Sequence, residues 1–108
     1  MKNFKNRVAY FEIENAINQI SDFTDKVKTV RIISNWASEQ LGYDIHETEA
    51  YARSHIANIV RENEVAKMLK RIENDLLTNN IDTNSELIVE STNNLLKNVS
   101  EKLRHARN

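Results

Sequence analysis

The chain has 108 residues, of which 40% are hydrophobic and 29% charged, and its formal net charge is −1 at pH 7. This length favours one domain, so we expect residues 1–108 to form a single domain. The chain has no Cys, no Pro and one Gly, which excludes disulfide scaffolds, Cys-based metal sites, thiol catalysis and glycine-rich phosphate loops. Its near-neutral charge gives no strong field that would attract nucleic acid or anionic lipid.

The sequence also indicates the cellular location and the origin of the protein. No stretch free of charge approaches the roughly 20 apolar residues that a membrane span needs. The basic start of the chain is not followed by the apolar core of a signal peptide, because Glu12, Glu14 and Asn15 interrupt it. We therefore expect a cytoplasmic protein without a membrane association. The counts of 15 Asn and 11 Ile fit an origin in a low-GC bacterium, phage or plasmid.

The first predicted helix spans about residues 3–20. Its apolar residues recur every three or four positions, which places them on one side of a helix; they are Phe4, Val8, Phe11, Ile13, Ile17 and Ile20. Ser21 and Asp22 predict a break, since either side chain can accept a hydrogen bond from the free amides of a following helix. Because no Gly or Pro stands there, segments 3–20 and 23–41 could also form one continuous helix.

The second predicted helix spans residues 23–41 and again has a single apolar stripe. The stripe comprises Phe23, Val27, Val30, Ile33, Ala37 and Leu41. Gly42 predicts the end of this helix, because glycine adopts the left-handed conformation of a helix C-terminus without a steric cost.

The third predicted helix begins at Asp44, which forms a capping-box pattern with Glu47. Its apolar residues are Ala52, Ile56, Ile59, Val60, Val65, Met68, Leu69, Ile72 and Leu76. The polar residues 61–64 interrupt the spacing, so we expect a long third helix that is kinked near 61–64, or whose apolar stripe rotates there. Asn79 and Asn80 predict its end.

The fourth predicted helix begins with a second capping-box pattern, from Thr83 to Glu86. Its stripe contains Ile88, Leu95, Val99, Leu103 and Ala106, widened by Leu87 and Leu96. The fold class is therefore all-α, a small bundle of three to four amphipathic helices, or of five. A domain of this size covers only part of its apolar surface, so we also expect the long third helix to pack against a second copy in a homodimer.

No constellation of residues indicates catalysis, a metal or a cofactor. His46 and His55 are nine residues apart and fall on opposite faces of one helix, so they cannot share a metal ion. Ala50 stands where a zinc-protease motif starting at His46 would need its second His. We therefore expect no enzyme and no cofactor, and helix histidines that are solvated or half-buried.

Two features suggest contact with a partner through charge or shape. The turn around Gly42 is similar to the corner of a helix-turn-helix, although Glu47 and Glu49 would then face DNA phosphates. Basic residues gather near the C-terminus, where they could contact phosphate or an acidic protein surface, or could compensate the helix dipole; these are Lys97, Lys102, Arg104 and Arg107.

Three aromatic residues complete the candidates for partner binding. Trp36, Tyr43 and Tyr51 would form a protein-binding anchor if they were exposed together, and would otherwise close the end of the core. The leading hypothesis is a non-enzymatic helical protein that acts by protein–protein interaction, as a regulator, inhibitor or adaptor of a larger protein. The alternatives are a nucleic-acid-binding regulator that uses the Gly42 corner or the basic C-terminal helix, and a structural homo-oligomer.

Overall fold

The described part of the chain is all-helical. The computed structural model describes residues 4–83 and 85–107, apart from the side chains of residues 4–9, 103 and 105–107. These residues form five helices and no strand, which confirms the predicted fold class: α1 (Phe4–Asn18), α2 (Phe23–Leu41), α3 (Ile45–Glu62), α4 (Val65–Thr78) and α5 (Glu86–Arg107). None of the helices described is long and apolar enough to cross a bilayer.

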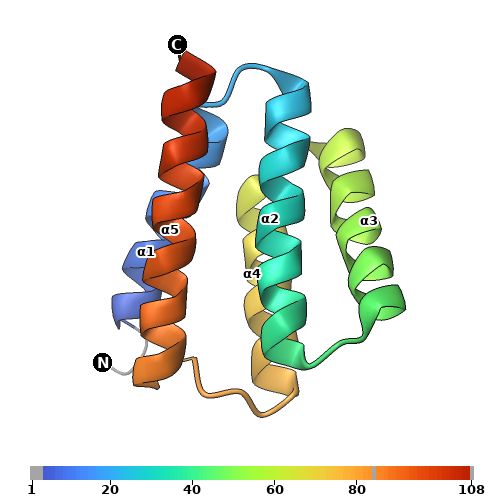
Figure 1. The fold of residues 1–108 in the computed structure, drawn as a ribbon, viewed down its shortest axis with the longest axis vertical. Coiled ribbons are helices and arrows are strands. Elements are labelled where there is room, and N and C mark those ends of the chain that lie inside the picture. Colours follow the sequence, from blue (N-terminus) through green and yellow to red (C-terminus); the bar gives the residue numbers. More distant parts are fainter. Residues whose placement is uncertain (1–3, 84, 108) are drawn as a thin grey trace.

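Four of the helices form a ring around a common core, and the remaining one, α3, packs against the outside of this ring and adds Ile59 to the core (Figure 1). α1 packs against α5, α5 against α2, α2 against α4, and α4 against α1, so the four contacts close a ring. α3 lies at the edge of this ring, where it packs along α2 and touches α4. The bundle measures 36 × 30 × 21 Å along its principal axes.

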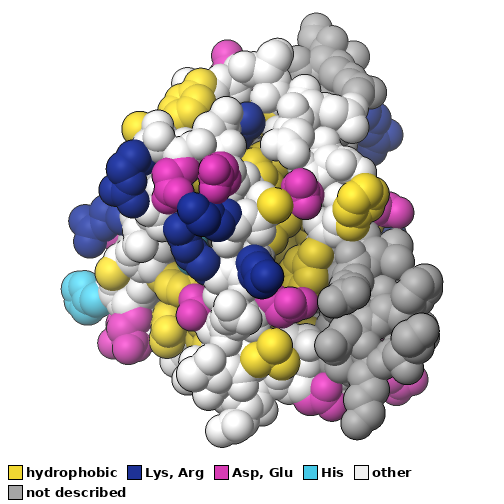
Figure 2. All heavy atoms as spheres, turned by 180° about the vertical axis from the view of Figure 1, so that it is seen from behind, with side chains coloured by type: hydrophobic (Ala, Val, Ile, Leu, Met, Phe, Trp, Pro, Cys, Tyr) yellow, Lys and Arg dark blue, Asp and Glu magenta, His cyan; other side chains and the backbone are white. Residues whose placement is uncertain are grey.

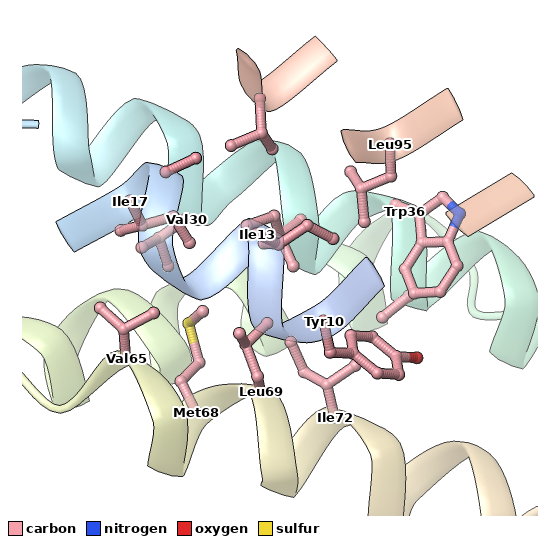
Figure 3. Close-up of a cluster of buried hydrophobic side chains, with 14 of the residues drawn as sticks. Tyr10, Ile13, Ile17, Val30, Trp36, Val65, Met68, Leu69, Ile72 and Leu95 are labelled. Carbon is pink, nitrogen blue, oxygen red and sulfur yellow. The ribbon is translucent and has the colours of Figure 1, made fainter. Parts of the chain in front are cut away.

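The core is formed by branched aliphatic side chains from every helix of the ring (Figure 3). Ile13 and Ile17 of α1 and Ile72 of α4 are completely buried, and Leu95 of α5 is nearly so. Helices of 14–22 residues are marginally stable alone, so their stability depends on this packing.

The stripe on α1 differs from the predicted one. Among the described side chains of α1, Tyr10, Ile13, Ala16 and Ile17 are buried, as is Ile20 just after the helix, whereas Phe11 is 63% exposed. Phe11 was predicted to be buried, but a residue two positions before Ile13 points to a different side of the helix. The side chains of Phe4 and Val8, also predicted for this stripe, lie outside the described residues.

The first break falls where the sequence predicts it. α1 ends at Asn18 and α2 begins at Phe23, so segments 3–20 and 23–41 form two helices. The Asp22 carboxylate accepts a hydrogen bond of 3.0 Å from the Asp25 amide and caps α2. An N-cap of this kind stabilises a helix by roughly 1 kcal/mol, which is enough to define a start without Gly or Pro.

Gly42 ends α2 in the predicted left-handed conformation, with φ 73° and ψ 27°. Its amide donates to the Glu39 carbonyl at 3.2 Å and the Tyr43 amide donates to the Ser38 carbonyl at 3.1 Å. This pair of bonds is a Schellman motif, which satisfies carbonyl groups that the end of a helix leaves free.

Replacing Gly42 with alanine is expected to lower the free energy of unfolding by about 1 kcal/mol, because an L-residue is strained at this φ. A Cβ at position 42 would meet no other atom within 4 Å, so the loss comes from backbone conformation alone. Urea unfolding followed by circular dichroism measures the change. Gly42→Asn provides the control and should lose less, since asparagine tolerates the left-handed region; equal losses for the two variants would contradict this account.

The predicted third helix is two helices. α3 ends at Glu62 and α4 begins at Val65, with Asn63 in the left-handed conformation at φ 52°. A single helix kinked near 61–64 is therefore not observed, because Asn63 ends the helix and the chain restarts after Glu64. The sequence predicted where the helix is interrupted, but it did not predict that the interruption divides the segment into two separate helices.

This break changes the expected partner of the third segment. All five apolar residues of α4 in the predicted stripe are buried inside the chain: Val65, Met68, Leu69, Ile72 and Leu76. The α4 part of the face on which we expected a second copy to pack is therefore covered within the chain. Val60, also predicted for the stripe, is 61% exposed beside the break.

The end of α4 and the start of α5 are also set by hydrogen bonds. Asn80 is left-handed at φ 62°, and the Ile81 amide donates to the Leu76 carbonyl at 3.0 Å, which confirms the predicted stop. α5 begins later than its predicted capping box, because the Ser85 hydroxyl accepts the Ile88 amide at 3.3 Å while Thr83 is buried. On α5, Ile88, Leu95 and Val99 are buried as predicted, whereas Leu87 is exposed. The side chains of Leu103 and Ala106 lie outside the described residues.

Candidate protein-binding surface

Trp36 joins α2 to α5 and is buried. Its indole Nε1 donates a hydrogen bond of 2.6 Å to the Ser91 hydroxyl, and the Gln40 side-chain amide approaches the same hydroxyl at 3.5 Å. With 8% of its surface exposed, Trp36 packs with the core, as in the second of its two predicted roles. Little of its surface is therefore available to a partner.

Trp36 lines a groove between α2 and α5, which has a volume of about 540 Å³. The groove is lined by Ile32, Asn35, Trp36, Glu39, Tyr43, Thr48, Ser91, Asn94, Leu95 and Asn98. Asn94 and Asn98 are one turn apart on α5, and Asn35 faces them from α2. Side-chain amides both donate and accept, so these walls can bind polar groups of either kind above an apolar floor.

The three asparagines of this groove were not predicted from the sequence. Their spacing on α5 was visible, since Asn94 and Asn98 are separated by four residues. Their position opposite Asn35 depends on the contact between α2 and α5, which are far apart in the chain. No local pattern identifies that contact.

The two tyrosines lie on either side of the start of α3. Tyr43 lines the groove and its ring makes an edge contact with Tyr51, with centroids 5.6 Å apart. The Tyr51 hydroxyl donates a hydrogen bond of 2.7 Å to the Asp75 carboxylate of α4, and Tyr51 does not line the groove. The three predicted aromatic residues therefore do not form one exposed anchor, because Trp36 faces α5 and Tyr51 faces α4.

The cations of α5 are exposed, but they do not share one side of the helix. Lys102 follows Asn98 by one turn and extends the line of groove residues on α5. Lys97 and Arg104 are seven residues apart and share a neighbouring side, where Arg104 lies 3.8 Å from the Glu101 carboxylate. The side chain of Arg107 lies outside the described residues.

The opposite face of the bundle has mixed charge (Figure 2). Acidic and basic side chains lie next to one another around a strip of hydrophobic side chains between α1 and α4. Lys67 is 3.0 Å from Glu62 and 3.2 Å from Glu64, and Arg71 is 3.5 Å from Glu62. The hydrogen bond from Lys67, with Arg71 adding to it, lowers the pKa of the Glu62 carboxyl. Lys67 and Arg71 of α4 thus form ion pairs with Glu62 at the end of α3, across the break between the two helices.

The corner at Gly42 does not have the geometry of a helix-turn-helix. α2 and α3 run beside one another in opposite directions (Figure 1), and theirs is the most extensive contact between the described helices. The two helices of a helix-turn-helix cross at about 90–120° instead. The predicted capping box is formed: the Glu47 amide donates to the Asp44 carboxylate at 2.8 Å and the Asp44 amide donates to the Glu47 carboxylate at 2.9 Å, which accounts for the residues that follow the corner.

One of the histidines departs from the prediction. His46 is exposed at the start of α3, whereas His55 is 4% exposed and neither of its ring nitrogens has a hydrogen-bond partner among the described residues. Burial lowers the pKa of the His55 ring below its ordinary value of 6.5. No group of three or more His, Cys, Asp or Glu within the described residues could hold a metal ion.

A comparison with protein families gives one match. The family model described as ATPase inhibitor subunit zeta matches residues 1–102. This chain belongs to that family. Comparisons with curated proteins and with solved structures give no significant match.

The description of the zeta family agrees with the general prediction. It names an inhibitor and a subunit, and so a regulatory protein that acts through another protein. The matched range contains every residue of the groove between α2 and α5, together with Lys97 and Lys102. Arg104 and Arg107 lie beyond it, so these two cations are outside the part that resembles the zeta family.

Proposed function

We propose that this chain is an inhibitory subunit of an ATPase, which it regulates by binding and without catalysis of its own. The observation that carries the proposal is the match of residues 1–102 to the zeta family. The ring of four helices with α3 beside it supports it, because such a rigid body presents fixed surfaces to a larger protein. We place the chain in the cytoplasm, in agreement with the expectation from its sequence.

We also propose where the ATPase is contacted, which is the groove between α2 and α5 with the cations beside it. At one end Tyr43 and the exposed part of Trp36 offer aromatic surface, and aromatic residues are enriched in the energetically important parts of interfaces. At the other end, Lys102 with Lys97 and Arg104 supplies positive charge. A matching segment of the ATPase would combine apolar and acidic side chains.

The first test is ATP hydrolysis by the purified ATPase of the source organism, measured while the purified chain is added. We expect hydrolysis to fall with the amount added and to level off at a fixed ratio of chain to ATPase. Co-sedimentation of the two proteins measures binding separately. Unchanged hydrolysis together with no co-sedimentation contradicts the proposal.

A charge-reversal pair tests the contact surface. Lys97→Glu/Lys102→Glu is expected to weaken inhibition by roughly tenfold, because charges at the rim of an interface govern the rate of association. The effect should shrink as salt increases, since salt screens exposed charges. Lys28→Glu/Arg53→Glu is the matched control, with the same change of charge at exposed positions of α2 and α3. Equal weakening by both pairs would show that only net charge matters and would refute the proposed surface.

A further inference from the structure

His55 is the buried member of a partly buried polar cluster that joins α3 to α4. Its ring packs edge-on against the Tyr51 ring, with centroids 4.5 Å apart and an interplanar angle of 86°. Tyr51 in turn donates its hydroxyl proton to the Asp75 carboxylate of α4 at 2.7 Å. We call Tyr51, His55 and Asp75 the α3–α4 cluster. Direct contact between the two helices is otherwise limited compared with that between α2 and α3.

The cluster fits a neutral His55 ring. Both nitrogens are buried without a hydrogen-bond partner among the described residues. An uncharged imidazole tolerates such a place at moderate cost, whereas an imidazolium has two N–H donors and a charge to satisfy. The nearest acid that acts on the ring, Asp75, is already bonded to Tyr51.

The charged groups that act on His55 come from α4. α4 supplies Asp75, which favours the protonated ring, and Arg71, which opposes it, and burial outweighs both. From α1, the buried Tyr10 hydroxyl acts on Tyr51. α2 supplies none of the described charges that shift the His55 pKa, since its Arg31 pairs with Glu49 at the surface.

We propose that the α3–α4 cluster is a pH-sensitive contact. It holds α3 against α4 while His55 is neutral, and it opens when the ring is protonated. On protonation the ring must either draw Asp75 away from the Tyr51 hydroxyl or leave its place between the helices. Both changes break the contact that links α3 to α4. The cluster lies within one chain, so the inference can be tested without an ATPase and does not depend on the proposed function.

The direction of the pH dependence follows from the lowered pKa of His55. Above pH 6.5 the ring is neutral in the folded and the unfolded chain, and the α3–α4 cluster makes its full contribution to stability. As the pH falls below 6.5 the unfolded or opened state takes up the proton first, so stability is lost until the pH reaches the folded-state pKa. Each unit between the two pKa values favours opening by about tenfold.

Two measurements on the complete chain test the proposal. Titration of the imidazole signals by NMR should show His55 protonating below pH 6.5. Amide hydrogen exchange, corrected for its intrinsic pH dependence, should show protection near Asp75 falling about tenfold per unit of the His55 pKa shift. Protection near Ile13, in the contact between α1 and α5, should change less.

His55→Phe keeps an aromatic ring that cannot be protonated, so its protection near Asp75 should no longer depend on pH in this range. His46→Gln is the control, because it removes the exposed histidine of the same helix but keeps His55 and therefore the wild-type response. Tyr51→Phe is a second variant that needs no substitution of His55. It frees Asp75 and should raise the pKa of His55.

Three results would overturn the proposal. They are a wild-type His55 that titrates at or above pH 6.5, a response in His55→Phe equal to that of the wild type, and an equal loss of protection in all helices. The first would show that the ring is not held neutral, the second that another group responds, and the third that the chain unfolds as a whole.

Discussion

Trp36→Ala is expected to lower the free energy of unfolding by about 3–5 kcal/mol, as for other large aromatic residues removed from protein cores. The substitution removes packing from the middle of the contact between α2 and α5, and it leaves the Ser91 hydroxyl without its 2.6 Å donor. A domain of this length has a total stability of roughly 5–15 kcal/mol, so the loss is a large part of it. Urea unfolding followed by circular dichroism gives the value, since Trp36 is the one tryptophan and its fluorescence is lost.

Trp36→Phe separates the two contributions. It keeps most of the buried ring and removes the indole donor, so its loss should be closer to about 1 kcal/mol, the net value of one hydrogen bond, plus a small packing term. Ser91→Ala in the same background should then have little further effect, because the two residues share one bond. A loss in Trp36→Phe as large as in Trp36→Ala would show that the hydrogen bond and not packing dominates.

Ile13→Ala is the second substitution with a large expected effect, about 2–5 kcal/mol of unfolding free energy. Ile13 is completely buried between α1 and the helices packed against it (Figure 3). The deleted carbon atoms would therefore leave a cavity that the surrounding core side chains cannot fill. Phe11→Ala is the matched control on the same helix. Phe11 is 63% exposed, and its loss should stay within about 0.5 kcal/mol.

The comparison of Ile13 with Phe11 also tests which side of α1 is buried. The sequence alone predicted both residues to be buried. If Phe11→Ala were as destabilising as Ile13→Ala, Phe11 would have to be buried as well, which would contradict its 63% exposure. Thermal unfolding of both variants, together with the urea data, checks the ranking.

The ends of the helices were predictable because they are determined locally. Asp22, Gly42, Asp44 and Asn80 act on amides or carbonyls within a few residues, so their chemistry can be recognised without a fold. The completeness of the break at Asn63 was not predictable in the same way. It also depends on distant groups, such as the Lys26 ammonium, which donates to the Asn63 side chain at 3.2 Å.

The candidate partner-binding residues were predicted less well, because exposure depends on which helices become neighbours. Trp36 lies one position away from the apolar stripe of its helix. Its indole N–H has a hydrogen-bond acceptor because Ser91 of α5, which is distant in sequence, packs beside it. His55 was expected to be solvated or half-buried, and its burial follows from the position of α4 behind Tyr51. The general class of function needed no such detail, since it rested on composition and on the missing catalytic patterns.

The pairing of α1 with α5 has a consequence for synthesis of the chain. The hairpin of α2 and α3 joins neighbours in sequence, so it can close while the ribosome is still making the rest. α1, by contrast, finds its main neighbour only when the last helix has emerged, and until then its aliphatic side has no permanent cover. During that interval the nascent chain exposes the hydrophobic surface of α1, and we therefore expect chaperones to bind to this segment.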